Sequence, residues 1–239
     1  MTTALLIAIA IASAAGLMRG FAGVGSGMLM APFFVKLFGP IDTIAIIIMM
    51  ELVVTAQLLP TVWREIDWRV IAPMGGLAAL SMPLGSWLLV SLDPKQIATG
   101  IAALVMLFAA VLMTGWRYEG PKPLWATLGV GSVSGVLMAL TSLGNPPVML
   151  YLLSSRDPAA TNRANFTGYF AITLIALIAM MTLSGLIGWN AVTMLAALLP
   201  VFMIFAWIGS RLFRQSSELI YRRVALGILF CAGLYNLIQ

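Results

Sequence analysis

Long apolar runs follow one another from end to end of this chain, and they restrict its fold more than any other feature. Of the 239 residues, 62% are hydrophobic and 9% are charged, whereas a soluble domain carries about 25% charged residues. Because so little charge does not cover a soluble surface, we expect a protein that crosses a lipid bilayer many times. Ten apolar runs are separated by glycine, proline or charged residues, at 3–19, 27–38, 42–60, 70–91, 95–115, 124–140, 145–154, 161–187, 191–210 and 220–238.

These runs are expected to be helices. Only helices and closed barrels satisfy their backbone hydrogen bonds inside a bilayer, and the runs lack the alternation of barrel strands. We therefore predict an all-α, polytopic transmembrane helix bundle. The first residues, MTTALLIAIAIASAAG, also resemble a signal peptide, but no basic residue precedes the apolar stretch, so we interpret them as the first membrane helix.

Two of the runs, 27–38 and 145–154, are too short to cross a bilayer, since a span needs about 20 residues. Each follows a break rich in glycine or polar residues, GFAGVGSG at 20–27 and TSLGNPP at 141–147. We interpret the two runs as parts of re-entrant hairpins or of broken helices. The sequence leaves both arrangements open.

Basic residues predict the orientation, because the cytoplasmic loops of membrane proteins are rich in Lys and Arg. If the chain starts outside and every run crosses, the inside connections hold eleven of the thirteen basic residues, whereas eight spans place at best nine inside. We therefore predict ten membrane elements with both termini on the outer side. The eleven residues are Arg19, Arg64, Arg69, Arg117, Lys122, Arg156, Arg163, Arg211, Arg214, Arg222 and Arg223.

The ten elements divide into two halves of five, residues 1–118 and 119–239, which are the predicted domains. In each half a long run, a break and a short run precede three long runs. Since five is odd, the second half inserts upside down relative to the first, and inverted repeats with interrupted segments are typical of secondary transporters. A few short segments are similar in the two halves. These are IDW at 66–68 with IGW at 187–189, and Gly85-Ser86 with Gly209-Ser210.

The two breaks resemble those of the sulfite exporter TauE/SafE family, also called the toluene-sulfonate uptake permeases. The first copy reads GLMRGFAGVGSGMLMAPFF from Gly16, and the second reads GVLMALTSLGNPPVMLYLL from Gly135. The resemblance covers nearly the whole chain. It implies a multi-pass carrier in the plasma or inner membrane for sulfite, a sulfonate or a related organosulfur anion. A passive anion channel and a carrier of non-sulfur organic acids are the alternatives.

The chain departs from the family pattern at both breaks. The first glycine run reads GVGSG rather than an unbroken glycine string, and Asn145 stands where a glycine is usual. Both changes add side chains that form hydrogen bonds, and we interpret them as marks of a particular substrate.

The two breaks are also the predicted anion site. Helix N-termini offer free N–H groups and a positive dipole end, and glycine lets an oxyanion approach the backbone closely. The alternative is tight helix packing, since Gly-xxx-Gly is a common membrane interface. We predict packing for Gly131 and Gly135. The predicted substrate-binding residues at the breaks are Gly23, Gly25, Ser26, Gly27, Ser142, Gly144, Asn145 and Pro146.

Ionisable residues inside the runs are further candidates, because charge within a bilayer is costly and marks function. Glu51 lies nine residues after Asp42, which is about 13 Å along a helix and so near the midplane. It either carries a proton coupled to anion movement or forms a structural pair with an arginine. Arg19 is a candidate counter-charge for the anion, or else a cytoplasmic residue that follows the topology. Arg163 is a candidate anion guide at the inner side.

Asn165 and Tyr169 complete the predicted substrate-binding set. They share a helix face with Asn162, and we expect that face to point into the bundle. Thr55 and Gln57 are expected to point inward in the same way on the helix of Glu51.

The sequence favours transport over catalysis. It contains no histidine and one cysteine, Cys231, so we expect no metal, no cofactor and no enzymatic activity. The sequence contains no P-loop, so it gives no sign of an ATP-driven pump. The expected partners are the lipid bilayer, a small anion and coupled protons, with no nucleic acid. The sequence does not give the oligomeric state.

Overall fold

The computed structural model describes residues 2–91, 122–141, 145–155 and 157–217, and also 219–221, 223, 224 and 227. Every regular element in these ranges is helical, as predicted. The run 95–115 and nearly all of the run 220–238 lie outside the described residues, and the other eight runs are helices. The elements are α1 (Thr2–Ala22), α2 (Ser26–Phe38), α3 (Pro40–Val62), the 3₁₀ helix η1 (Trp63–Glu65), α4 (Trp68–Ser91), α6 (Leu124–Thr141), α7 (Asn145–Leu153), α8 (Ala159–Leu183) and α9 (Trp189–Gln215).

Five described helices, α1, α3, α4, α8 and α9, are long and apolar enough to cross a membrane. The short runs form short helices, since α2 has 13 residues and α7 has nine. The chain is therefore a multi-pass membrane protein by the length and composition of its helices. The ten-element count stays a prediction.

Helix α8 ends four residues earlier than its apolar run. Gly185 has a left-handed φ of 65°, and its N–H donates to the Thr182 carbonyl while the N–H of Leu186 donates to that of Met181. These bonds satisfy the last carbonyls of the helix, so the apolar residues up to Ile187 form a connection. Helix α9 instead continues five residues beyond its predicted end, to Gln215.

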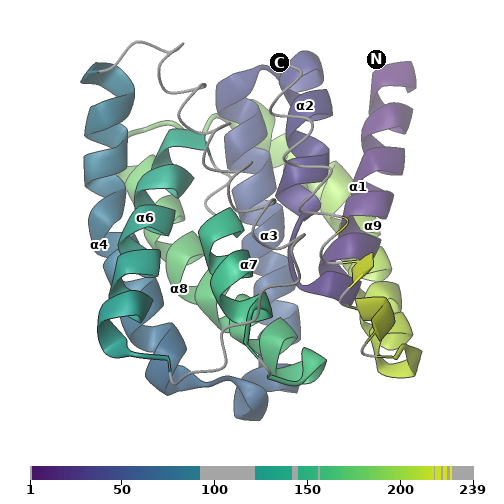
Figure 1. Cartoon of the computed structure of the whole chain (residues 1–239). Helices are drawn as coiled ribbons and strands as arrows, with labels where there is room; N and C mark the ends of the chain where they lie inside the picture. Colours follow the sequence, from purple (N-terminus) through teal and green to yellow (C-terminus); the bar gives the residue numbers. More distant parts are fainter. Residues whose placement is uncertain are drawn as a thin grey trace.

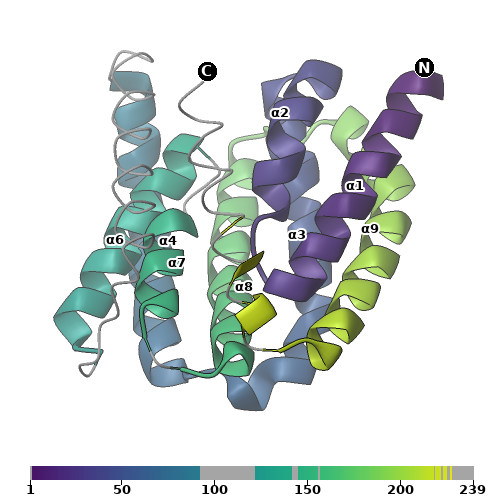
Figure 2. The same ribbon diagram turned by 45° about the vertical axis from the view of Figure 1, so that its right-hand side comes forward.

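The chain reverses direction at the first break. Helix α1 starts at the upper end of the bundle, which holds the N-terminus in Figure 1, and α2 runs back toward that end. Helix α3 then runs down and α4 runs up. In the second half, α6 runs up, α7 runs down, α8 runs up and α9 runs down, so each helix is opposite in direction to its counterpart (Figures 1 and 2).

Helices α3 and α8 pack against each other at the centre of the bundle. The pair α1 and α9 lies on one side of them and the pair α4 and α6 lies on the other (Figure 2). Helix α3 also packs on α9, and α8 packs on α4. Each outer pair therefore joins a helix of one sequence half to a helix of the other.

Glycines allow both outer pairs to approach closely. A Cβ atom at Gly20 would lie 1.9 Å from the Ala206 carbonyl oxygen on α9, and one at Gly135 would lie 2.0 Å from the Ala78 carbonyl oxygen on α4. Gly131 is equally close to α4, with 2.3 Å to the Met74 carbonyl oxygen. The packing prediction for Gly131 and Gly135 is therefore confirmed.

Candidate functional site

The first break is a hairpin tip between α1 and α2. Gly23 and Gly25 have φ values of 80° and 94°, a left-handed conformation that residues with a side chain rarely adopt. Gly25 directly precedes α2, so the first N–H groups of that helix face the break without partners in their own helix. Gly27 packs α2 on α3, because a Cβ atom there would lie 3.5 Å from Cγ2 of Ile47.

Arg19, in the last turn of α1, ties this tip to α3. Its Nε lies 2.6 Å from Oε2 of Glu51, and its Nη2 donates to the Thr55 hydroxyl at 2.8 Å. Its Nη1 donates to the Gly23 carbonyl. The Ser26 hydroxyl donates to the other carboxylate oxygen, Oε1 of Glu51. One carboxylate therefore bridges the end of α1 and the start of α2.

This cluster is closed to solvent. Arg19 is 0% exposed, Ser26 is 1% exposed and Glu51 is 4% exposed, and the ring of Phe170 from α8 lies 4.5 Å from the guanidinium carbon of Arg19. Arg19 is therefore a buried residue rather than a surface residue that follows the topology. Glu51 has the arginine partner that one of its two interpretations predicts, and its proton-carrying role stays a prediction.

A second guanidinium reaches the same tip from α8. Nε and Nη2 of Arg163 donate to the Gly20 carbonyl at 3.0 and 2.8 Å, and Nη2 also donates to the Ser210 hydroxyl at 2.9 Å. Gly23 leaves room for this side chain, since a Cβ atom there would lie 3.2 Å from Cγ of Arg163. Arg163 is 4% exposed, and its guanidinium stacks on Phe213 at 4.9 Å.

The hairpin tip therefore has an excess of positive charge. Arg19, Glu51 and Arg163 are the buried charged residues among those described, so two buried cations accompany one buried carboxylate, which pairs with Arg19. The partners of Arg163 are a carbonyl, a hydroxyl and a ring. A buried guanidinium that has no carboxylate partner in the described part of the chain is costly inside a membrane, so the arrangement favours a bound anion.

The burial of Arg19 and Arg163 changes which basic residues support the predicted orientation in the membrane. Arg19 and Arg163 belong to the eleven basic residues of the predicted inside connections, but both are buried in helices. The bias toward the inner side then depends on the remaining nine, against Lys36 and Lys95 outside.

The second break is described only in part. Ser142 and Gly144 lie outside the described residues, and Asn145 and Pro146 start α7 without described side chains. The neighbouring contact is a hydrogen bond of 2.7 Å between the hydroxyls of Ser134 on α6 and Tyr169 on α8. It corresponds to the Arg19–Glu51 pair, because both contacts join the first and third helices of a half, α1 with α3 and α6 with α8.

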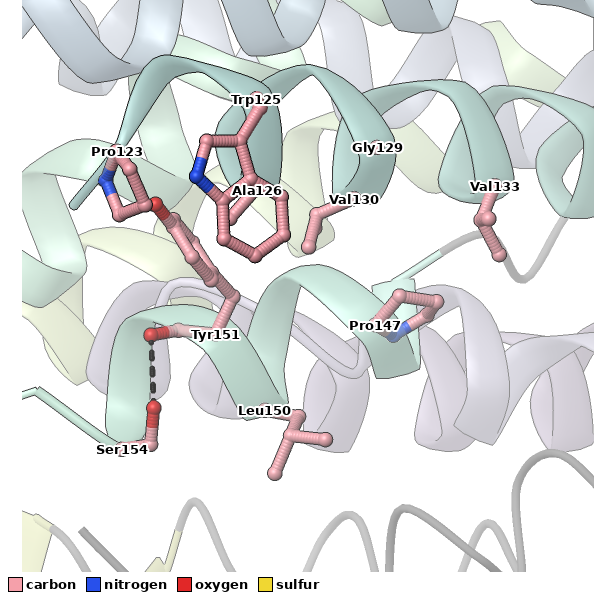
Figure 3. A pocket seen from close by; sticks show the side chains of 10 residues that line it. All are labelled: Pro123, Trp125, Ala126, Gly129, Val130, Val133, Pro147, Leu150, Tyr151 and Ser154. Atoms are coloured by element: carbon pink, nitrogen blue, oxygen red, sulfur yellow. Dashed lines mark hydrogen bonds between the residues drawn. The ribbon is translucent and has the colours of Figure 1, made fainter. Parts of the chain in front are cut away.

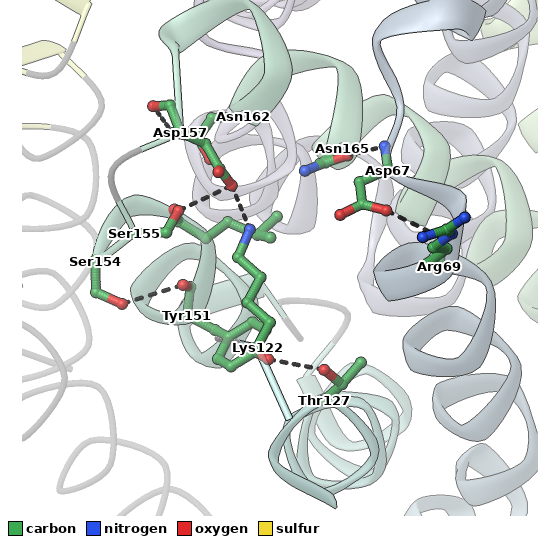
Figure 4. A network of polar contacts seen from close by, with 11 residues as sticks. Asp67, Arg69, Lys122, Thr127, Tyr151, Ser154, Ser155, Asp157, Asn162 and Asn165 are labelled. Carbon is green, nitrogen blue, oxygen red and sulfur yellow. Dashed lines mark hydrogen bonds and ion pairs between the residues drawn. The ribbon is translucent and has the colours of Figure 1, made fainter. Parts of the chain in front are cut away.

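Asn165 and Asn162 lie in a polar network at the lower end of the bundle (Figure 4). Oδ1 of Asn165 accepts from the Asp67 N–H at 2.8 Å, and Nδ2 of Asn162 donates to the Asp157 carbonyl at 3.2 Å. Lys122 forms an ion pair with the Asp157 carboxylate. Nδ2 of Asn165 and Oδ1 of Asn162 are buried without a partner among the described residues. Both asparagines therefore point inward, as predicted, and hold the starts of α4 and α8 in place.

Two cavities lie away from the hairpin tip. One of about 400 Å³ separates α6 from α7 and is mostly apolar, as Figure 3 shows. The other, of about 530 Å³, opens near the N-terminus of α1 and is lined by Asp42, Asn190 and Thr193 among apolar residues. An acidic lining disfavours an anion. Neither cavity is lined by Arg19 or Ser26.

The structure adds residues that the sequence did not assign to the site. Thr55 bonds Arg19, Phe170 covers it, and Ser210 bonds Arg163. Thr55 could have been found, because it follows Glu51 by four residues and so shares its face. The bond between Ser134 and Tyr169 was not predicted, because the sequence alignment of the two copies from Gly16 and Gly135 does not place Ser134 opposite Arg19.

Among the described residues, no group of three or more His, Cys, Asp or Glu side chains is placed to hold a metal ion. The family model described as sulfite exporter TauE/SafE matches residues 8–236. The comparisons with curated proteins and with solved structures find no match.

Proposed function

This chain belongs to the sulfite exporter TauE/SafE family, and we propose that it is a secondary-active transporter of sulfite, a sulfonate or a related organosulfur anion. The observation that carries the proposal is the excess of buried positive charge at the hairpin tip, where Arg19 pairs with Glu51 and Arg163 bonds the Gly20 carbonyl. Two buried guanidinium groups near this point favour an oxyanion, which accepts charge-assisted hydrogen bonds from them. The first N–H groups of α2 would add hydrogen bonds to it.

The proposed mechanism is alternating access between two inverted repeats. The opposite directions of corresponding helices support it (Figures 1 and 2), and so does their packing, since α1 packs on α9 as α6 packs on α4. The α1–α2 hairpin is the proposed re-entrant element of the first half. Its counterpart is the α6–α7 break with Asn145.

We place the protein in the plasma or inner membrane with both termini outside. The lower end of the bundle, which carries Arg64, Arg69 and Arg214 at exposed positions, would then face the cytoplasm, in agreement with the positive-inside rule. Glu51 is the proposed carrier of a coupled proton.

Transport by purified protein in liposomes tests this function. We expect saturable uptake of radiolabelled sulfite or of a small sulfonate, accelerated by the same anion on the opposite side. Organic carboxylates without sulfur should compete weakly. Large single-channel currents without acceleration from the opposite side would indicate a channel, and preference for a carboxylate would contradict the sulfur assignment.

The double variant Ser26→Ala with Asn145→Ala tests the site. It should raise the half-saturating anion concentration at least about tenfold, since each lost hydrogen bond to a charged group is worth about 1.5–3 kcal/mol. The control is Ser13→Ala, which removes an α1 hydroxyl that bonds the Ile9 carbonyl of its own helix. Unchanged affinity in the double variant would contradict the placement of the anion at the breaks.

A further inference from the structure

The groups best placed to bind an anion at the hairpin tip already hold one. Glu51 presents two oxygens, one to Nε of Arg19 at 2.6 Å and the other to the Ser26 hydroxyl. A sulfonate, a sulfite or a carboxylate offers a pair of oxygens in the same way. The carboxylate of Glu51 therefore has the chemistry and the position of a bound substrate.

We propose that Glu51 is an internal substitute for the substrate, and that the anion binds only when this carboxylate takes up a proton and releases Arg19 and Ser26. The inference depends on the proposed transport function. It adds that the proton and the anion bind together, as one proton for each anion, and that Arg19 and Ser26 exchange one oxyanion for the other.

The burial of the cluster explains why the proton is needed. If the anion displaced Glu51 in its ionised form, the carboxylate would remain in a closed apolar site without its two partners, which is strongly unfavourable. A proton from the aqueous phase turns it into a neutral acid. The buried groups then carry the same net charge before and after a monovalent anion binds, so one proton entering with one anion leaves the electrostatic balance unchanged.

Few other ionisable groups lie on the described helices packed around Glu51. Arg19 of α1 contacts the carboxylate, and α8 carries Arg163, which bonds the Gly20 carbonyl, and Tyr169, whose hydroxyl bonds Ser134. The remaining charges of the elements packed on α3, and of α3 itself, lie toward helix ends. These residues are Lys36 on α2, Asp42 on α3, Arg64 and Glu65 on η1, and Arg211 and Arg214 on α9.

Binding of methanesulfonate to the purified full-length chain tests the proposal, because this strong-acid anion keeps one charge throughout the pH range. We expect the Kd to fall about tenfold for each unit by which the pH is lowered, as long as Glu51 is ionised in the free protein. Calorimetry in two buffers of different ionisation enthalpy should give one proton taken up for each anion bound.

The variant Glu51→Gln separates this exchange from other titrations. Its amide holds no exchangeable charge, so its Kd should be independent of pH and close to the wild-type value at low pH. Glu65→Gln, at an exposed position on η1, should keep the wild-type slope. If the glutamine variant does not fold, the number of protons that the wild type takes up for each bound anion still tests the exchange.

The outcomes distinguish the two proposals. Saturable binding without proton uptake, or a wild-type Kd that does not change with pH, would overturn the exchange and leave the transport function standing. Loss of binding in folded Glu51→Gln would also overturn it, since Glu51 would then help to hold the anion. If methanesulfonate, sulfite and thiosulfate all failed to bind at any pH, both the exchange at Glu51 and the proposed transport function would be contradicted.

Discussion

Arg19 and Glu51 form a buried ion pair, and each charge offsets the cost of burying the other. The sequence indicated both residues as candidates, and a structural pair with an arginine was one of two interpretations of Glu51, because a charge in an apolar run is costly. It did not predict which arginine. Arg19 lies 32 positions away and Arg163 is also close to the hairpin tip, so the choice depends on how α1 and α8 pack on α3.

The pair gives a prediction at the residue scale. Arg19→Met should destabilise the protein by about 3–5 kcal/mol, because Glu51 would be left buried without its cation. The double variant with Glu51→Met should recover most of this loss. Denaturant unfolding in detergent measures the difference, and losses that simply add in the double variant would contradict a direct pair.

Asn165 on α8 is a residue whose role the sequence did not predict. Asn165 was predicted to bind substrate and is buried as expected, but its Oδ1 accepts from the Asp67 N–H across a helix connection. Hydrogen bonding between distant segments leaves no local pattern, so the sequence does not distinguish this role from ligand binding.

The helices themselves were predictable because their signals are local. Apolar runs and glycine breaks gave the bounds of α2 within one residue and those of α7 within one residue. The pairing of α1 with α9 and of α4 with α6 was not predictable. These helices are apolar on most faces, so hydrophobicity does not indicate which face packs, whereas the glycines indicate a close contact without naming its partner.

Glycine substitutions test these contacts at the element scale. Gly135→Ala should destabilise the protein by about 1–3 kcal/mol, since the added methyl group would force α6 away from α4. Gly129→Ala is the matched control on the same helix, because a Cβ atom there would meet nothing within 4 Å. The control should be neutral or stabilising by about 0.4–1 kcal/mol. Equal thermal stability of the two variants would contradict the close approach.

At the scale of the whole molecule, the orientation in the membrane is open to direct measurement. In a Cys231→Ser background, Arg64→Cys and Ser217→Cys place single thiols at exposed positions of the lower end, and Ser184→Cys places one at the upper end. On intact cells, a membrane-impermeant maleimide should label Ser184→Cys and reach the other two only after permeabilisation. The reverse pattern would place both termini inside.

The pairing of helices from different sequence halves has a consequence for either half taken alone. Helices α1 and α4 of the first half find their glycine-mediated partners, α9 and α6, in the second. A protein made of residues 1–118 alone would therefore leave two glycine-lined surfaces without partners. It would be expected to assemble with a copy of itself inserted in the opposite direction.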